Sequence, residues 1–165
     1  MGARTGDAYL QGLRERPRDV WIHGEQVRGD ITAHPAFHNV TRSVAALYDL
    51  QHDPALRDEM TYVSPSSGER VGLSFLQPRT PGDLQRRRRM MKRWADLSGG
   101  MLGRTPDYLN SGLMAFAAAA PYFGQDDPRF ADNVRRYYEH VREHDLCLTH
   151  SIITPQANHA AGAAE

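Results

Sequence analysis

The segment Gly103–Tyr108 (GRTPDY) carries two side chains that could bind a polar aromatic ligand. Arg104 stands just before a predicted helix start, and Tyr108 falls in the first turn of that helix. A guanidinium and a phenol placed in this way can reach into one cleft and hold an anionic or phenolic group through charge-assisted hydrogen bonds. The residues alone leave an alternative open, in which Thr105 and Pro106 only start the helix and Arg104 is solvated.

The last twenty residues hold two further candidates for a binding site. His150 lies in an otherwise apolar, extended run (LTHS), and an imidazole with an ordinary pKa of about 6.5 can donate to a phenolate or transfer a proton. Gln156 and Asn158 follow in the segment PQAN, where carboxamides could pair with the edge of a heterocycle because they both donate and accept hydrogen bonds. A buried structural histidine and a simple turn are the alternatives.

Other chemical patterns are absent from the sequence or weak. The run Arg86–Arg89 falls on a predicted helix, where its side chains point around the circumference, so we expect a solvated, ion-paired face and no nucleic-acid site. The eight histidines form no zinc pattern, and one cysteine cannot build a thiolate cage. We therefore expect no metal. The sequence also lacks a dinucleotide-binding glycine fingerprint, a Walker loop and a G-x-S-x-G nucleophile elbow.

The composition indicates a globular chain whose net charge creates no strong electrostatic field. Of its 165 residues, 40% are apolar and 24% are charged, and the net charge is zero with a pI of about 7.1. We therefore expect neither nucleic acid nor an anionic membrane as a partner. The lone Cys147 cannot form an internal disulfide, and the charged amino terminus lacks the apolar core of a secretory signal. The sequence thus predicts a cytoplasmic location.

Hydrophobic periodicity and turn residues predict several helices with one or two small β-hairpins. Helices are expected at about 5–17, 34–51, 80–99, 106–121 and 128–147, with a short helical turn after Asp53-Pro54. Hairpins are expected within 19–32, around a Gly24-Glu25 turn, and within 60–75. In the last helix, the residues expected to face inward are Phe130, Val134, Tyr137, Val141 and Leu146. The fold class is therefore mainly α.

Taken together, eight blocks of the sequence resemble the large oxygenase component of the 4-hydroxyphenylacetate 3-monooxygenase family. The blocks are RTGDAYLQGLR, VWIHGEQV, HPAFHNVTRSVAALYDLQHDP, TYVSPSSGERVGLSFLQPRT, DLQRRRRMMKRWAD, GRTPDY, ADNVRRYYEHVREHDLCLTH and TPQANHA. They cover nearly the whole chain in the family's order, which is far more specific than any single motif.

The resemblance implies a plan like that of the acyl-CoA dehydrogenases. In such proteins a helical amino-terminal domain precedes a middle β domain and a carboxy-terminal helical bundle that forms tetramers. The chain would then be a fragment: residues 1–147 would form the helical domain, and residues 148–165 would begin the linker into a missing middle domain. On this view, we expect the fragment alone to bind FAD poorly and to catalyse little.

The resemblance also implies a reaction and roles for the candidate residues. A separate NAD(P)H-dependent reductase would supply FADH2, which with O2 forms a C4a-hydroperoxyflavin that hydroxylates a phenol at the ortho carbon. Arg104, Tyr108 and His150 match the family's catalytic residues beside the hydroperoxide and the phenol. Gln156 and Asn158 match a flavin-contacting segment. The family often has arginine after this asparagine, and His159 stands there instead, which puts one flavin contact in doubt.

Two other functions compete with this hypothesis. The chain could be a non-catalytic or split-chain interaction module that docks on a partner carrying the remaining domains. It could also resemble the acyl-CoA dehydratase relatives of the family, but these carry iron–sulfur ligands, which the single Cys147 cannot provide.

Overall fold

The structure of the chain is a computed structural model that describes residues 2–16, 18–100 and 107–148. Helices dominate, as the periodicity predicts, and two small antiparallel hairpins accompany them. The helices are α1 (Gly6–Glu15), α2 (His38–Asp49), α3 (Arg57–Met60), α4 (Pro81–Ser98), α5 (Asp107–Ala118), α6 (Ala120–Phe123) and α7 (Pro128–Glu143), with a 3-10 turn, η1, at Leu73–Phe75. Among the described helices, none is long and apolar enough to cross a membrane.

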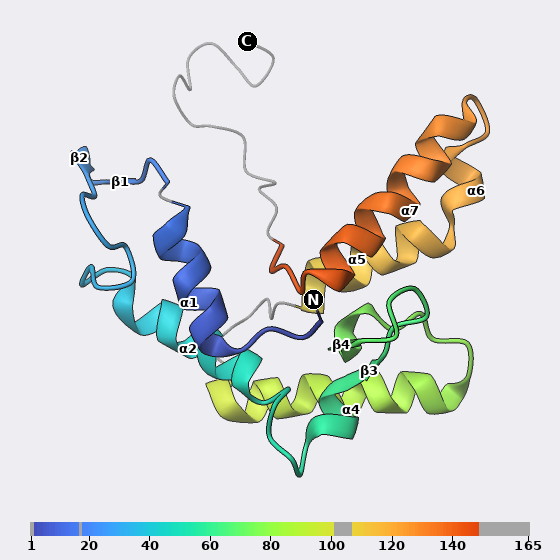
Figure 1. Ribbon diagram of the computed structural model, residues 1–165, viewed down its shortest axis with the longest axis horizontal. Helices are drawn as coiled ribbons and strands as arrows, with labels where there is room; N and C mark the ends of the chain where they lie inside the picture. Colours follow the sequence, from blue (N-terminus) through green and yellow to red (C-terminus); the bar gives the residue numbers. More distant parts are fainter. Residues whose placement is uncertain (1, 17, 101–106, 149–165) are drawn as a thin grey trace.

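The elements form a base and an arm (Figure 1). Helices α1 and α2 pack together on one side, and the long helix α4 runs beneath them and beneath the second hairpin. Helices α5 and α7 lie side by side and extend away from α4, with α6 at their far end. The amino terminus lies near the end of α7, because Gly2 N donates to Glu143 O at 3.1 Å.

Both hairpins lie where the sequence predicts them. In the first, β1 (Trp21–Ile22) pairs with β2 (Glu25–Gln26), and the turn is formed by His23 and Gly24, both with positive φ. The turn is therefore one residue earlier than expected, since two successive left-handed positions suit a tight hairpin turn and Glu25 already belongs to the strand. In the second, β3 (Thr61–Val63) pairs with β4 (Arg70–Gly72).

The longest helix of the described residues is α4, whose two ends are set by its sequence. Thr80 Oγ1 accepts from the backbone of Asp83 at 3.2 Å, and the Asp83 carboxylate accepts from the backbone of Thr80 at 3.0 Å. Pro81 occupies the first turn, where its missing amide costs nothing. Gly99 ends the helix with a φ of 60°, a left-handed position that glycine adopts without strain.

Three expected helix boundaries are wrong. Helix α2 begins at His38, after a series of turns that follows His34-Pro35. Pro121 does not end the helical arm; it lies in the first turn of the separate helix α6, a position that tolerates proline. Helix α7 stops at Glu143 instead of reaching Cys147, because Asp145 adopts a φ of 47° that an α-helix cannot contain.

Two hydrophobic clusters hold the elements together. One joins η1, α5 and α7 through Phe75, Leu113, Met114, Ala117, Tyr138 and Val141, and the other joins α2, α3, η1 and α4 through Leu47, Met60, Leu73, Met90 and Trp94. The inward face expected for α7 is partly wrong. Phe130 and Tyr137 are half exposed, whereas Tyr138 is buried, because the stripe that continues from Val134 to Val141 passes through Tyr138.

Candidate functional site

Of the five predicted site residues, the structure describes Tyr108. It lies in the first turn of α5, as the helix-start pattern predicts, with half of its surface exposed. Arg104, His150, Gln156 and Asn158 lie outside the described residues. The structure does describe what holds the chain next to them, at Asp107 on one side and at Asp145–Leu148 on the other.

The start of α5 is fixed by a buried ion pair. Arg87 of α4 is almost fully buried, and its Nη2 lies 3.1 and 3.3 Å from the two carboxylate oxygens of Asp107. Ser111, one turn further along α5, donates to the same carboxylate at 2.7 Å and also accepts from Arg87. Burial raises the pKa of Asp107, and Arg87 and Ser111 offset this only in part. Asp107 therefore cannot move without leaving a buried guanidinium unpaired.

Arg87 also binds the 3-10 turn. Its Nη1 donates to the carbonyl oxygens of Ser74 and Leu76, at 2.5 and 3.2 Å. One side chain thus ties α4, η1 and α5 together. The expectation of a solvated arginine run is wrong at this position, although Arg88 and Arg89 are exposed as expected. Arg87 lies three and seven residues before the buried Met90 and Trp94. That spacing places Arg87 on the apolar stripe of the helix, and this position in the sequence pattern could have indicated that Arg87 is buried.

The segment that leads toward His150 is fixed by a second buried carboxylate, Asp145. Its Oδ2 accepts from Arg4 N at 2.9 Å and from Gln51 Nε2 at 2.8 Å, and its carbonyl oxygen accepts from Arg4 Nε at 2.8 Å. Burial raises the pKa of Asp145, against the opposing effect of these bonds. Leu146 and Leu148 then pack against the cluster that contains α5. The chain therefore leaves the described part next to the core beneath α5.

The exposed face of α5 next to Tyr108 suits a flat, uncharged group. No charged residue occurs between Tyr108 and Gly124, and the outward positions include Gly112, Ala115 and Phe116. Among the described residues, no heavy atom lies within 4 Å of where a Cβ on Gly112 would stand. An aromatic ring can thus approach the backbone one turn after Tyr108. The chemistry of this face fits one wall of a flavin or phenol site, while the predicted flavin-contacting residues lie outside the described part.

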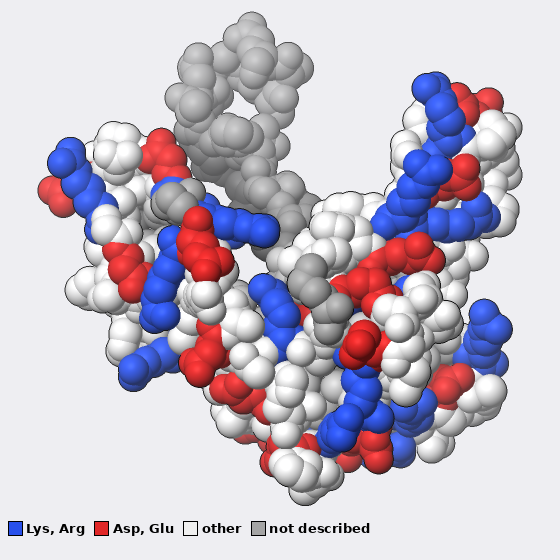
Figure 2. Space-filling model, viewed as in Figure 1, with Lys and Arg blue, Asp and Glu red and all other residues white. Residues whose placement is uncertain are grey.

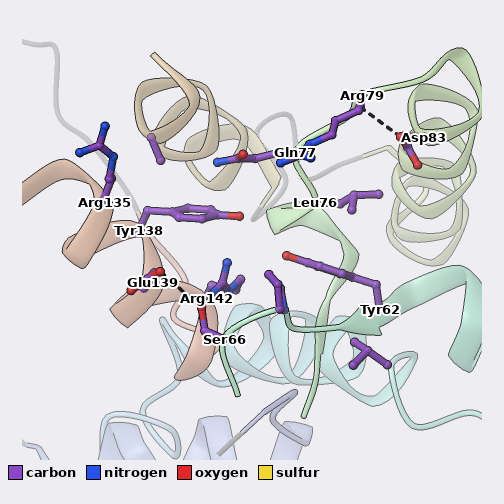
Figure 3. A pocket seen from close by; sticks show the side chains of 13 residues that line it. Tyr62, Ser66, Leu76, Gln77, Arg79, Asp83, Arg135, Tyr138, Glu139 and Arg142 are labelled. Atoms are coloured by element: carbon purple, nitrogen blue, oxygen red, sulfur yellow. Dashed lines mark hydrogen bonds between the residues drawn. The ribbon is translucent and has the colours of Figure 1, made fainter. Parts of the chain in front are cut away.

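A hollow of about 580 Å³ lies elsewhere, between the second hairpin, the loop before α4 and the helix α7. Tyr62 and Tyr138 point toward one another across it, and both hydroxyl groups donate to Phe75 O, at 3.3 and 2.6 Å (Figure 3). Arg142 lies over the Tyr138 ring and donates to Ser66 Oγ at 2.7 Å. Tyr108 is not among the described residues that line this hollow, and these polar groups already have partners, so we assign no ligand to it.

The charges on the face shown in Figure 2 do not gather into a further site. Arginine and acidic side chains alternate over the face shown in Figure 2, without a region of one sign. Within the described ranges, no group of three His, Cys, Asp or Glu side chains could hold a metal ion. The organised features of the site region are therefore the two buried carboxylates and the face of α5.

Comparisons with known proteins identify the fold and the family. A family model described as "4-hydroxyphenylacetate 3-hydroxylase N terminal" matches residues 5–165. The oxygenase component of 4-hydroxyphenylacetate 3-monooxygenase from Geobacillus sp. (strain PA-9) is 49% identical over 97% of this chain and 32% of its own length.

Solved structures agree with this match. A crystal structure of such an oxygenase component superposes with a TM-score of 0.86 at 50% identity, over 97% of this chain and 33% of that one. Another, described as complexed with FAD and 4-hydroxyphenylacetate, gives a TM-score of 0.85 at 51% identity, over 94% and 31%. The likeness confirms the expected helical amino-terminal domain of the acyl-CoA-dehydrogenase-like plan.

This chain spans about a third of the length of the relatives that it matches. The match extends over nearly all of its own residues. The chain belongs to the 4-hydroxyphenylacetate 3-hydroxylase family and corresponds to its amino-terminal part.

Proposed function

We propose that this chain is the amino-terminal part of a two-component, flavin-dependent monooxygenase that hydroxylates a phenol at the ortho carbon. The proposal is supported by the family and by a relative whose structure is described as holding FAD and 4-hydroxyphenylacetate. A reduced flavin delivered by a separate NAD(P)H-dependent reductase supplies, together with O2, the oxygen atom for this chemistry. The proposed location is the cytoplasm, and the proposed assembly of the full-length protein is a homotetramer.

In this proposal the residues of the chain seat and activate the phenol. Arg104 provides a fixed positive charge beside the substrate oxygen, and Tyr108 a hydroxyl group that donates or accepts. His150 accepts or shares the phenolic proton, which makes the ring more electron-rich and a better nucleophile. Gln156 and Asn158 contact the flavin ring edge. Helix α5 then forms one wall of a cleft that excludes water.

The domain boundary belongs to the same proposal. Residues 1–147 form the helical domain, and residues 148–165 begin the linker toward a middle β domain. The hydrogen bonds of Asp145 support this division, because they tie the chain that follows α7 to Arg4 and Gln51 of the helical domain.

The observation that carries the proposal is the placement of Tyr108. The buried Arg87–Asp107 pair fixes the residue before it, and the uncharged face of α5 continues beside it. We would test the function with a chimera in which residues 5–165 replace the matching third of the Geobacillus relative. With reduced flavin and O2, the chimera should hydroxylate 4-hydroxyphenylacetate, and Tyr108→Phe should lower kcat/KM while the control Tyr122→Phe should not. A folded, FAD-binding chimera without hydroxylation would refute the proposal.

The isolated chain should bind reduced FAD only weakly, because most of the flavin surface belongs to segments beyond these residues. Anaerobic titration with FADH2, followed by flavin fluorescence or calorimetry, measures this directly. Micromolar binding together with phenol hydroxylation by the 165-residue chain would show that one third of the relatives' length suffices.

A second candidate function, an interaction module that docks on a partner, is favoured by the aromatic residues exposed on the arm. Phe116 and Tyr122 are 55% and 70% exposed on α5 and α6, on the face that carries no charge. The partner would be a separate chain that carries the part of the relatives' length that this chain does not match. Co-expression with the remaining two-thirds of the Geobacillus relative tests it: a stable complex supports docking, and separate elution of two folded chains opposes it.

A further inference from the structure

A small polar cavity lies between α2, η1 and α5, and the side chain of Asn110 is incompletely bonded there. Asn110 is 3% exposed, and its Nδ2 donates to Ser74 Oγ at 3.1 Å. Its Oδ1 is the one buried side-chain oxygen or nitrogen in the described residues found without a hydrogen-bond partner. Leaving a buried carboxamide oxygen unbonded costs folding free energy, so native proteins nearly always satisfy such a group.

The cavity has a volume of about 10 Å³, which suits a single water molecule. Its lining residues are all buried, and they are Leu47, Tyr48, Gln51, Ser74, Trp94, Asn110 and Asp145. A buried water needs two to four polar partners, and five of these seven side chains end in an oxygen or an amide nitrogen, while Trp94 is already bonded to Leu47 O at 3.2 Å. A larger ligand does not fit.

We propose that this cavity is a binding site for one ordered water molecule, which donates to Asn110 Oδ1 and joins the two buried carboxylate anchors into one polar network. On one side, Asn110 bonds Ser74, whose carbonyl oxygen accepts from Arg87, the partner of Asp107. On the other side, Gln51 bonds Asp145, which also binds Arg4. No direct hydrogen bond joins Asn110 to Gln51 among those found in the described part, so the water closes the gap.

Through this network Asn110 and Gln51 help to position Tyr108. This positioning role, unlike the water site, rests on the proposed function. The anchor at Asp107 precedes Tyr108 by one residue, and the anchor at Asp145 precedes His150 by five. A water that bonds both sides keeps the start of α5 and the segment leading to His150 in a fixed relation. The water site itself does not depend on flavin or on any reaction.

The first experiment detects the water in the 165-residue chain by nuclear magnetic resonance. Overhauser contacts between water and the side-chain amide protons of Asn110 and Gln51 should have the sign of a long-lived bound water. The exposed Asn133 on α7 serves as the control for rapidly exchanging surface water. Asn110→Leu, which removes the acceptor but keeps the volume, should abolish the contact at Gln51. Surface-like contacts at both buried amides in the unsubstituted chain would overturn the water site.

The second experiment tests energetic coupling across the gap. Asn110→Ala and Gln51→Ala share no direct bond, so a deviation of the double variant from the product of their two effects on the unfolding equilibrium constant must pass through the cavity that both side chains line. A shared water should make the double variant deviate from that product by about threefold or more. Multiplicative effects would contradict the network. If a variant does not fold, the water contacts of the unsubstituted chain still decide whether the site exists.

The third experiment tests positioning with 3-fluorotyrosine placed at Tyr108 alone. Gln51→Ala should shift or broaden this fluorine signal although Gln51 lies on the other side of the cavity, and the exposed Gln11→Ala should leave it unchanged. A bound water with an unmoved Tyr108 signal would overturn the positioning role. Loss of the network with retained hydroxylation in the chimera would separate this inference from the proposed function.

Discussion

At the scale of single residues, the described structure depends on buried charged groups that have polar partners. Both terminal nitrogens of the Arg87 guanidinium donate hydrogen bonds, to Asp107, Ser111 and backbone carbonyls. A buried ion pair adds little net stability over apolar packing, but breaking it by removing one partner is costly. The pair therefore specifies one position for the start of α5.

Arg87→Met should lower the free energy of unfolding by about 3–5 kcal/mol, because the Asp107 carboxylate stays buried without its partner. Arg88→Met, one position along the same helix and exposed, is the matched control and should change it by less than about 0.5 kcal/mol. Urea unfolding followed by circular dichroism measures both. Equal effects of the two substitutions would mean that Arg87 is solvated.

Glu143 should make stability depend on pH in the acid range. Partial burial raises its pKa, but the hydroxyl groups of Ser64 and Ser67 and the guanidinium of Arg142 outweigh burial and lower the pKa. Its contribution is therefore complete above the pKa of the unfolded chain and is lost as pH falls through the lower, folded-state value.

The stability difference between the unsubstituted chain and Glu143→Gln should thus be largest near neutral pH and should shrink on acidification. Ser67→Ala removes one donor and should give a smaller change of the same sign. Unfolding measured across the acid range checks this, and a difference that grows on acidification would show that the folded chain binds the proton more tightly than the unfolded chain.

At the scale of elements, the register of α7 decides which tyrosine the core contains. Tyr138→Phe removes the 2.6 Å hydrogen bond to Phe75 O and should cost about 1 kcal/mol, whereas Tyr137→Phe, half exposed on the neighbouring face, should cost almost nothing. Thermal unfolding of the two variants measures the difference. A larger loss of stability for Tyr137→Phe would mean that Tyr137, and not Tyr138, faces the core, as the sequence pattern suggests.

Helices α4 and α7 show why some parts of the fold can be predicted from the sequence and others cannot. The caps of α4 are local, since Thr80, Pro81 and Gly99 act within a few residues of each end, and sequence alone places them well. The end of α7 is not local: Asp145 leaves the helix to bind Arg4 and Gln51, which are distant in sequence. The buried stripe of α7 cannot be assigned from the sequence alone, because Tyr137 and Tyr138 are adjacent residues of the same type and either could face the core.

The candidate site likewise contains residues that the sequence predicts and residues that it does not. Tyr108 was predicted from a helix-start pattern and lies in the first turn of α5, where a phenol can face a ligand. Arg87, Asp107 and Asn110, which position that turn, were missed because their partners come from other elements. A polar residue on an apolar stripe, as Arg87 is with Met90 and Trp94, is the sequence feature that points to such buried anchors.

At the scale of the whole molecule, the chain exposes an uncharged aromatic face that a longer protein or a partner can cover. Phe116→Asp should weaken binding of the separately expressed remainder of the Geobacillus relative by about tenfold or more, since burying one phenylalanine contributes about 1.5–3 kcal/mol. Val63→Asp alters an apolar residue of similar exposure that lies on β3, outside the uncharged face of α5 and α6, and serves as the control. Equal affinities of both variants would place the interface elsewhere.

The central claim is that Arg104, Tyr108 and His150 meet around one phenol. The most direct measurement is a crystal structure of the chimera with FAD and 4-hydroxyphenylacetate bound. We expect the phenolic oxygen within hydrogen-bonding distance of the His150 imidazole, with the Arg104 and Tyr108 side chains lining the same cavity. Side chains of these three residues on separate surfaces, with the phenol bound elsewhere, would contradict it.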